Sequence, residues 1–318
     1  MILNYIRMLI NYIFKGNFFF KPLKLIIEPT NACNLACIMC PHKDMVRKIG
    51  FMDIELYKKI IDESNDFVQE YQISLVGEPT LHPKIIDMIT YSCLKSNFTN
   101  LYTNATLLDD ILCNKIIKSG LDNIYLTVDG ETKETYEKIR QNANFESTIE
   151  NVIRLINIRS KLKSKKPNIN LQIIEMKENI NEIHKFIDRF KKFQIDNLII
   201  RPYDTWAGNL EILSHSPFTN PSKKRKKKCT QLWTTMVITW NGDVIPCCRD
   251  YDANSIIGNI KERQILDIWN SEKMKYFRKN HMNLKLCENC YEWNREFDVK
   301  RHIFPFIKRH IGIAFKNL

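Results

Sequence analysis

Three cysteines near the N-terminus are the side chains in this sequence best suited to chemistry. Cys33, Cys37 and Cys40 follow the spacing Cys-x3-Cys-x2-Cys, soon after an apolar run at residues 25–27. Together they offer three thiolates to one compact metal centre, one fewer than the four that ligate a typical [4Fe–4S] cluster. One coordination position would therefore stay open, as catalytic metal sites require. Half of a zinc site is the structural alternative, although zinc sites usually pair cysteines two to four residues apart.

The triplet resembles the cluster-binding motif of the radical S-adenosylmethionine (radical SAM) superfamily. The resemblance implies that the three cysteines hold a [4Fe–4S] cluster whose open iron chelates the amino and carboxylate groups of S-adenosylmethionine (SAM). In that family, reductive cleavage of SAM releases a 5′-deoxyadenosyl radical that abstracts hydrogen from the substrate. The residue before the third cysteine is often aromatic in the family, whereas this chain has Met39. We discount the difference, because that residue contacts adenine mainly through packing and backbone.

Polar motifs downstream of the triplet resemble SAM-binding motifs of the same family. Gly77, Glu78 and Pro79 resemble a glycine–glutamate motif whose residues contact the amino group of SAM. A carboxylate or carbonyl suits an ammonium group, and glycine permits a close backbone approach. Thr103 and Asn104 are similar to the Thr-Asn-Gly motif at the end of the family's next strand. The resemblance therefore implies that these five residues belong to a SAM site.

Thr127, Asp129 and Arg140 complete this set, because they resemble the family's Ser-x-Asp-Gly…Tyr…Arg pattern. Polar side chains at strand ends can bind the ribose hydroxyls and the methionyl carboxylate of SAM. Each motif alone is also typical of an ordinary turn or helix cap. The set is specific because its members occur in order along the chain, each at a predicted strand end.

A second group of cysteines lies in the C-terminal third of the chain: Cys229, Cys247, Cys287 and Cys290. Asn241-Gly242 between alternating apolar runs predicts a β-hairpin that carries Cys247 near its base. Four thiolates are enough to complete one further [4Fe–4S] cluster, and structural zinc is the alternative. The segment resembles the SPASM/twitch domains of radical SAM enzymes. Since the full SPASM pattern has seven cysteines and two clusters, we expect one auxiliary cluster here.

Cys248 adjoins the expected ligand Cys247, and the sequence leaves open which of the two binds the cluster. If Cys247 is the ligand, Cys248 points to the other side of the strand. It then either packs as a small apolar residue or serves the reaction. A thiol S–H bond is weaker than most substrate C–H bonds, so Cys248 could return a hydrogen atom to a substrate radical. The enzyme would then be an epimerase rather than a dehydrogenase.

The elements that must position these residues alternate regularly between residues 24 and 201. Six short apolar runs predict strands, at residues 25–28, 72–76, 98–103, 123–128, 169–174 and 197–201. The segments between them show helical spacing, as in Ile183, Phe186, Ile187 and Phe190. This alternation predicts an α/β fold with a parallel sheet and right-handed crossovers, which fits a partial (β/α)6 barrel of the TIM type. The radical SAM resemblance implies the same core.

We expect five segments along the chain. An N-terminal helical segment (1–23) precedes the partial barrel (24–205). A basic linker (206–228) leads to a small cysteine-rich domain of a β-hairpin and helices (229–295), and a tail helix (296–318) follows. The N-terminal segment either covers one end of the barrel or touches a membrane as an amphipathic helix. The basic run at residues 223–228 is either a solvated loop or a contact for a phosphate-bearing substrate.

Composition excludes several broad classes of protein. With 318 residues, 44% of them apolar, the chain can bury a full core, but no apolar run is long enough to cross a bilayer. Most of the ten cysteines fall in metal-ligand spacings rather than in a disulfide framework, which indicates a reducing, cytoplasmic compartment. The net charge of +12 is spread through a chain rich in Lys, Ile and Asn, so we do not expect a nucleic-acid partner.

Together these observations predict a radical SAM oxidoreductase or epimerase that abstracts hydrogen from a small, sugar-like molecule or a peptide. An external one-electron reductant of the flavodoxin or ferredoxin type is implied. Only a short stretch precedes the first predicted strand, which leaves no room for a leader-peptide-binding domain and favours a small molecule. A maturase of ribosomally made peptides is the alternative. A non-enzymatic zinc protein that binds RNA is a more distant one.

Overall fold

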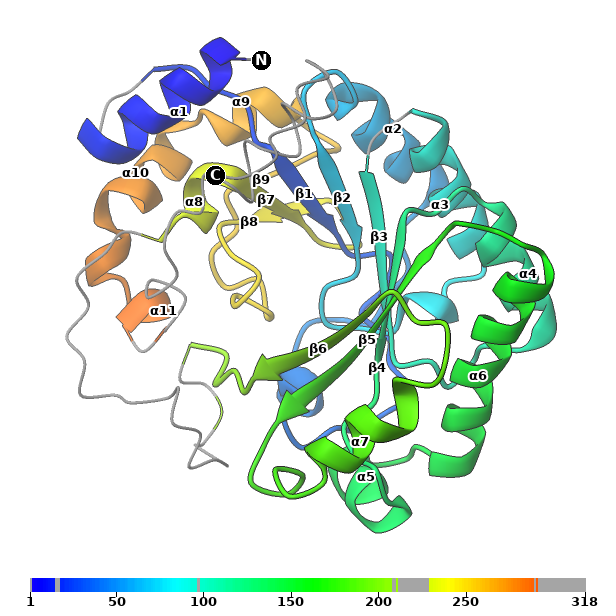
Figure 1. The fold of residues 1–318 in the computed structure, drawn as a ribbon. Helices are drawn as coiled ribbons and strands as arrows, with labels where there is room; N and C mark the ends of the chain where they lie inside the picture. Colours follow the sequence, from blue (N-terminus) through cyan, green and yellow to red (C-terminus); the bar gives the residue numbers. More distant parts are fainter. Residues whose placement is uncertain are drawn as a thin grey trace, which may run out of the picture.

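The computed structural model describes residues 2–14, 18–95, 98–207, 210, 229–288 and 290. Six parallel strands form its core: β1 (Lys24–Ile27), β2 (Glu70–Ile73), β3 (Phe98–Thr103), β4 (Asn123–Thr127), β5 (Asn168–Glu175) and β6 (Asn197–Pro202). Each strand pairs with the next in sequence, in the order β6-β5-β4-β3-β2-β1. The prediction of an α/β partial barrel is confirmed (Figure 1).

Helices cover the outer face of this curved sheet (Figure 1). They are α2 (Ile54–Ser64), α3 (Ile85–Leu94), α4 (Asp110–Lys118), α5 (Lys133–Ile139), α6 (Phe145–Lys161) and α7 (Ile183–Phe190). Alternate strand residues, such as Leu25 and Ile27 of β1 and Ile124 and Leu126 of β4, are buried in the main hydrophobic core. Because strand side chains alternate between faces, the intervening positions point into the barrel, where many of them are polar, as at Gln72.

The predicted strand boundaries hold to within a few residues, with one shift that matters for function. β3 begins and ends as predicted, at residues 98 and 103. β2 occupies Glu70–Ile73, whereas the sequence predicted residues 72–76. Residues 74–78 therefore form a loop at the carboxyl end of β2, which is where barrel enzymes gather their functional groups.

The cysteine-rich segment continues the barrel sheet. β7 (Thr235–Ile238) pairs in parallel with β1, and β8 (Asp243–Ile245) pairs antiparallel with β7. Gly242 in the turn between β7 and β8 has a φ of +92°, a conformation that favours glycine, so the predicted hairpin is confirmed. β9 (Gly258–Asn259) completes the sheet. The helices of this segment are α8 (Gln231–Thr234), α9 (Ile265–Trp269), α10 (Glu272–Asn280) and α11 (Lys285–Glu288).

The N-terminal helix α1 (Ile2–Phe14) packs beside this segment (Figure 1). Tyr5 and Met8 are buried, and the ring of Tyr12 meets Trp233 of α8 edge-on, with the ring centroids 5.2 Å apart. One face of α1 therefore packs on the fold, while Leu3, Ile6, Ile13 and Phe14 are exposed; contact of α1 with a membrane stays a prediction. None of the described helices is long and apolar enough to span a bilayer. The basic run at residues 223–228 and the expected tail helix at 296–318 lie outside the described residues.

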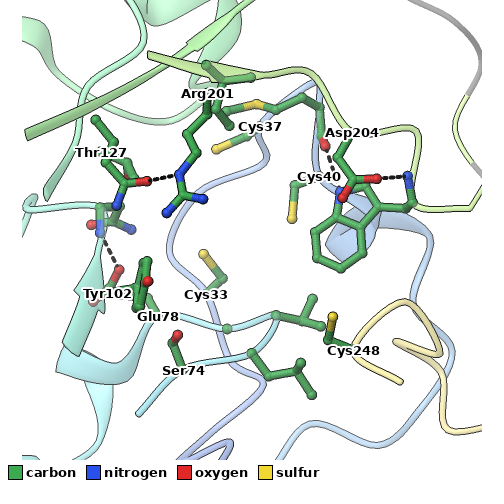
Figure 2. A pocket seen from close by; sticks show the side chains of 18 of the residues that line it. Cys33, Cys37, Cys40, Ser74, Glu78, Tyr102, Thr127, Arg201, Asp204 and Cys248 are labelled. Atoms are coloured by element: carbon green, nitrogen blue, oxygen red, sulfur yellow. Dashed lines mark hydrogen bonds between the residues drawn. The ribbon is translucent and has the colours of Figure 1, made fainter. Parts of the chain in front are cut away.

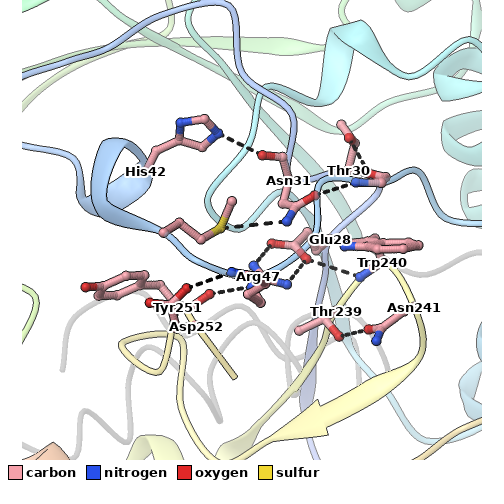
Figure 3. A network of polar contacts seen from close by, with 12 residues as sticks. Glu28, Thr30, Asn31, His42, Arg47, Thr239, Trp240, Asn241, Tyr251 and Asp252 are labelled. Atoms are coloured by element: carbon pink, nitrogen blue, oxygen red, sulfur yellow. Dashed lines mark hydrogen bonds and ion pairs between the residues drawn. The ribbon is translucent and has the colours of Figure 1, made fainter. Parts of the chain in front are cut away.

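A buried ion pair joins the barrel to the cysteine-rich segment (Figure 3). Glu28, which directly follows β1, is fully buried and accepts hydrogen bonds from Arg47 Nη1 at 2.8 Å and Nη2 at 2.6 Å. The same carboxylate accepts the backbone N–H of Trp240, in the hairpin turn, at 3.1 Å. Arg47 Nε donates to the carbonyl oxygen of Tyr251 at 2.6 Å. One charged pair thus ties the loop after β1 to two parts of the C-terminal segment.

Removing the Glu28 carboxylate should leave the Arg47 guanidinium buried without its partner. We expect Glu28→Ala to lower the free energy of unfolding by about 3–5 kcal/mol, as is usual when one member of a buried ion pair is removed. The double variant Glu28→Ala/Arg47→Ala should lose clearly less than the sum of the two single variants. Chemical denaturation of the four apoproteins measures this coupling, and strictly additive losses would contradict it.

Candidate functional site

The carboxyl ends of the barrel strands surround a cavity of about 420 Å³. Cys33, Cys37 and Cys40 all line it, as Figure 2 shows. All three lie in the loop between β1 and the short helix η1 (Pro41–Asp44). The structure therefore brings the predicted triplet together at the end of the barrel where catalytic groups gather.

Backbone hydrogen bonds fix the shape of the cysteine loop. Ala36 N donates to the carbonyl oxygen of Gln141 at 3.0 Å, and Ile38 N donates to that of Ile139 at 3.0 Å. Both acceptors lie at the end of α5 or just beyond it. The loop is thus attached to the opposite side of the barrel mouth, and the protein presents the three sulfurs from a defined backbone.

Burial holds the three cysteines in the thiol form at neutral pH. It raises the pKa of Cys33 to about 11 and that of Cys40 to about 12, and it also raises the pKa of Cys37. The pKa values of Cys33 and Cys40 are raised further by their sulfur neighbours, because adjacent thiolates repel each other. A cationic centre among them would offset both costs and release the thiol protons. This donor set therefore fits an iron–sulfur cluster held by three thiolates.

Glu78 ties together the loops on one side of the cavity. Its Oε1 accepts hydrogen bonds from the Thr80 backbone N–H (3.0 Å), the Thr80 hydroxyl (2.6 Å) and the Thr103 hydroxyl (2.7 Å). Its Oε2 accepts the backbone N–H of Asn104 at 2.7 Å, and its own backbone N–H donates to Ala32 in the cysteine loop at 2.8 Å. Glu78, whose carboxylate is predicted to contact SAM, thus also links the loops that follow β1, β2 and β3 by hydrogen bonds.

Gly77 is required by a close backbone approach. A Cβ atom at this position would meet the carbonyl oxygen of Thr30 at 2.4 Å and that of Ala32 at 2.6 Å. Neither backbone atom can give way without moving the cysteine loop, so only glycine fits. The glycine of the predicted motif therefore sets how closely the loop after β2 lies against the loop that carries the triplet.

Six of the eight residues predicted for the SAM site line the cavity: Gly77, Glu78, Thr103, Asn104, Thr127 and Arg140. Pro79 begins the short helix η2 (Pro79–Leu81), and Asp129 is fully buried behind the cavity wall. Asp129 accepts hydrogen bonds from Arg140 Nε at 2.8 Å and Nη2 at 2.5 Å. It therefore positions Arg140, whose Nη1 lies 4.0 Å from Cys37 Sγ. Contacts of these residues with SAM stay predictions.

The four cysteines of the second group lie outside the wall of this cavity. Cys229 is buried, and its backbone N–H donates to His281 Nε2 at 3.3 Å. Cys287 and Cys290 share one turn at α11, where Cys290 N donates to the carbonyl oxygen of Cys287 at 3.3 Å. Within the described part of the chain, no three His, Cys, Asp or Glu side chains converge closely enough to hold a single metal ion, and this applies to the triplet as well as to the second group. The ligand set of the auxiliary cluster stays a prediction.

Cys247 and Cys248 have different surroundings. Cys248 lines the cavity, where Figure 2 shows it across from Cys37, and its Sγ accepts a hydrogen bond from Arg249 Nη1 at 3.0 Å. Cys247 is not part of the cavity wall. Its pKa is raised well above the usual value by its hydrogen bond with Cys248 and by burial, with a further contribution from Cys229. β8 ends at Ile245, so the two cysteines lie beyond the strand rather than on opposite sides of it as the sequence predicted. Cys248 faces the cavity, and Cys247 as the cluster ligand stays a prediction.

Sequence reasoning missed several cavity residues: Gln172, Arg201, Asp204, Trp206 and Arg249. The strand-end rule could have found two of them, because Gln172 and Arg201 lie near the carboxyl ends of β5 and β6. Asp204 and Arg249 form an ion pair across 45 residues of sequence. They come from irregular segments and carry no local signal, so only the folded chain shows that they belong to the site.

Family comparisons agree with this geometry. The model of the radical SAM superfamily matches residues 27–190, just over half of the chain. This chain belongs to the radical SAM superfamily. The iron–sulfur cluster-binding domain called SPASM matches residues 229–291. The cofactors of this radical SAM protein are therefore a [4Fe–4S] cluster with SAM, and an auxiliary iron–sulfur cluster in the SPASM segment.

Individual relatives share most of the chain at low identity. The tungsten-containing aldehyde ferredoxin oxidoreductase cofactor-modifying protein of Pyrococcus furiosus is 25% identical, with 84% of this chain and 86% of that protein covered. The S-adenosyl-L-methionine-dependent 2-deoxy-scyllo-inosamine dehydrogenase of Niallia circulans is 24% identical, with 83% and 90% covered. Streptococcus suis SuiB bound to the precursor peptide SuiA has a similar fold, with a TM-score of 0.69 at 18% identity and 85% and 71% covered.

Removing the triplet should empty one cluster and leave the other. We expect the reconstituted protein to hold about eight irons and the variant Cys33→Ala/Cys37→Ala/Cys40→Ala to hold about four, as measured by iron and sulfide analysis. The variant should also form no 5′-deoxyadenosine from SAM and dithionite. Cys93→Ala, which removes a half-buried thiol of α3 outside the cavity, is the matched control. Unchanged iron in the triple variant would refute the assignment.

Single substitutions of the adjacent cysteines should separate their roles. Cys247→Ala is expected to lose about four irons, because one of four cluster ligands is removed. Cys248→Ala is expected to keep the full iron content, because its sulfur faces the cavity. Mössbauer spectroscopy of the ⁵⁷Fe-reconstituted proteins distinguishes the two clusters. The opposite pattern of iron loss would show that Cys248 is the ligand.

Proposed function

We propose that this radical SAM enzyme abstracts a hydrogen atom from a small, sugar-like molecule and that Cys248 then returns one, which gives a net epimerisation. The observation that carries the proposal is the position of Cys248 in the wall of the cavity that the cysteine triplet also lines. A thiol that serves only packing is usually fully buried among apolar groups. Cys248 is instead partly exposed and accepts a hydrogen bond from Arg249.

The cavity residues fit the family's cofactor arrangement. Cys33, Cys37 and Cys40 would hold the cluster, and the polar ends of β2 to β4 would receive SAM. Oε2 of Glu78 accepts only one hydrogen bond from the described residues, so it keeps acceptor capacity for an ammonium group. When bound, the cluster and SAM supply a 5′-deoxyadenosyl radical, which removes a hydrogen atom from a substrate carbon.

The step that we assign to Cys248 is the transfer of one hydrogen atom. The S–H bond breaks homolytically, a C–H bond forms at the substrate carbon, and a thiyl radical stays on Cys248. One electron and one proton then restore the thiol. We assign the electron to an external one-electron reductant of the flavodoxin or ferredoxin type. Arg249, which is itself paired with Asp204, fixes the position of the sulfur by its hydrogen bond.

The size of the cavity supports a small substrate. About 420 Å³ lies near the lower end of the range for small-molecule sites, roughly 300–1,000 Å³, and the same space must receive part of SAM. The Niallia circulans relative acts, by its name, on 2-deoxy-scyllo-inosamine and is a dehydrogenase. Oxidation is therefore the second candidate reaction, and an auxiliary cluster held by the SPASM segment would supply the electron acceptor that it needs. Peptide maturation is the alternative, because the cavity could receive a single side chain of a peptide.

The state of the cysteines supports a reducing compartment. Seven of the ten cysteines in the sequence are assigned here to cluster binding rather than to a disulfide framework. Free thiols and iron–sulfur ligands persist where glutathione and thioredoxin keep cysteines reduced. We therefore propose a cytoplasmic enzyme, in keeping with the electron donor that the reaction needs.

Solvent deuterium tests the role of Cys248. The S–H of a cysteine exchanges with D₂O, so a hydrogen atom returned by Cys248 should carry solvent deuterium into the product. We expect the wild-type enzyme, given SAM, dithionite and a panel of sugars and nucleotide sugars in D₂O, to form a product labelled with one deuterium, as read by mass spectrometry. Cys248→Ser should still form 5′-deoxyadenosine and give no such label.

A control variant and two contradictory outcomes complete the test of Cys248. Cys93→Ala should label its product like the wild type. Labelling that persists in Cys248→Ser would exclude Cys248 as the donor, and a dehydrogenated product without label would favour oxidation. If the wild type forms no 5′-deoxyadenosine under any of these conditions, the proposed function itself is wrong.

A further inference from the structure

The basic side chains of the cavity differ in how their charges are balanced. Four of them line its wall: Lys24, Arg140, Arg201 and Arg249. Three are paired with carboxylates, as Lys24–Glu70 (2.7 Å), Arg140–Asp129 (2.5 Å) and Arg249–Asp204. Arg201 is the exception: among the residues that the structure describes, no carboxylate lies within ion-pair distance of its guanidinium.

The guanidinium of Arg201 is nevertheless held in one orientation. Its Nε donates to Oε1 of Gln172 at 3.0 Å. Gln172 is 4% exposed, so this hydrogen bond forms in largely desolvated surroundings. Figure 2 shows the two terminal nitrogens of Arg201 directed into the cavity, between Thr127 and Cys37. Within the described residues, neither terminal nitrogen has a hydrogen-bond acceptor.

This arrangement is suited to an anion. A guanidinium presents its N–H donors in a planar fork that matches the two oxygens of a carboxylate or phosphate. In a partly desolvated cavity, an unbalanced positive charge gains more from such a partner than a surface arginine does. Because Gln172 accepts the hydrogen bond from Nε of Arg201, the two terminal nitrogens of the guanidinium stay available to a ligand. The neighbouring cations gain less from the same ligand, since carboxylates already balance their charges.

We propose that Arg201, oriented by Gln172, binds an anionic group of the substrate, a carboxylate or a phosphate, and so selects acidic or phosphorylated small molecules. This inference rests on the proposed function in one respect, namely that the substrate enters this cavity. SAM itself also carries a carboxylate, which is the other anionic group that Arg201 could bind. The residues that resemble SAM-binding motifs lie at or just after the carboxyl ends of β2, β3 and β4 and at the end of α5, whereas Arg201 lies on β6. Arg140, 4.0 Å from Cys37 Sγ, is the arginine beside the triplet.

Binding of simple anions to the reconstituted, SAM-saturated holoenzyme tests the proposal. We use pyrophosphate and malonate as probes and measure their dissociation constants by isothermal titration calorimetry. In Arg201→Gln, the affinity for the better probe should fall by about tenfold or more, the usual effect of losing a charge-assisted pair. Arg201→Lys should keep part of the affinity, because it keeps the charge and loses the fork. Which probe binds better tells whether the site prefers carboxylate or phosphate.

A matched control removes the same charge elsewhere. Arg263 is exposed and donates to the backbone of Asp267 outside the cavity, so Arg263→Gln should bind both probes like the wild type. The affinity of Arg201→Gln for SAM, measured in the same way without probe, should stay within about twofold, well below the tenfold loss that an arginine contact would cause.

Three results would overturn the proposal. In the first, neither probe binds the wild type at millimolar concentration. In the second, Arg201→Gln binds the probes as the wild type does. In the third, Arg201→Gln loses affinity for SAM, which would place Arg201 in the SAM site. A failure of the proposed function gives a different result. The wild type would then form no 5′-deoxyadenosine, whether or not it binds the probes.

Discussion

The hydrogen bonds of one buried carboxylate hold the site in shape. Glu78 is 3% exposed, yet four donors from Thr80, Thr103 and Asn104 surround its oxygens. A buried charge is tolerated only when it is hydrogen-bonded in this way. The donors come from the loops after β2 and β3, and the backbone N–H of Glu78 donates to Ala32 in the cysteine loop. Hydrogen bonds of one residue therefore hold these three loops together. The triplet cannot shift without disturbing the residues expected to hold SAM.

The strand β1 carries a second constraint of the same kind. Its C-terminal loop bears the cysteine triplet, and on its other edge it pairs with β7 of the SPASM segment. The hairpin β7–β8 then delivers Cys248 to the same cavity. Glu28, directly after β1, binds both Arg47 and the hairpin turn at Trp240. The cluster loop and the thiol opposite it are thus positioned from one strand, which is how two distant parts of the sequence make one site.

Charge pairing distinguishes the basic side chains of the cavity from one another. Three of its cations are neutralised by carboxylates, and in each pair the partner also fixes the side chain's position. A paired, buried cation gains less from an incoming anion than an unpaired one, because a carboxylate already offsets its charge. Arg201 is oriented by a neutral amide and, among the described lining residues, lacks a carboxylate partner, so it is the cation that we propose to meet an anion. Glu78, Asp129 and Asp204 act in the structure mainly as internal partners, which keeps the open surface of the site largely free of negative charge.

The sequence by itself determined the chemistry of the metal site and the class of the fold. The Cys-x3-Cys-x2-Cys spacing is a local property. The regular alternation of strands and helices predicts a parallel sheet, because the apolar faces of the helices then pack on the apolar face of the sheet. The strand at residues 98–103 and the Asn241-Gly242 turn were predicted closely for the same reason: their signals lie within a few residues. Tertiary structure decided what depends on distant partners. It placed Asp129 behind Arg140, separated the surroundings of Cys247 and Cys248, and brought Arg201 and Arg249 to the triplet. Such positions follow from the pairing of strands and loops far apart in the chain, and no local pattern of residues encodes them.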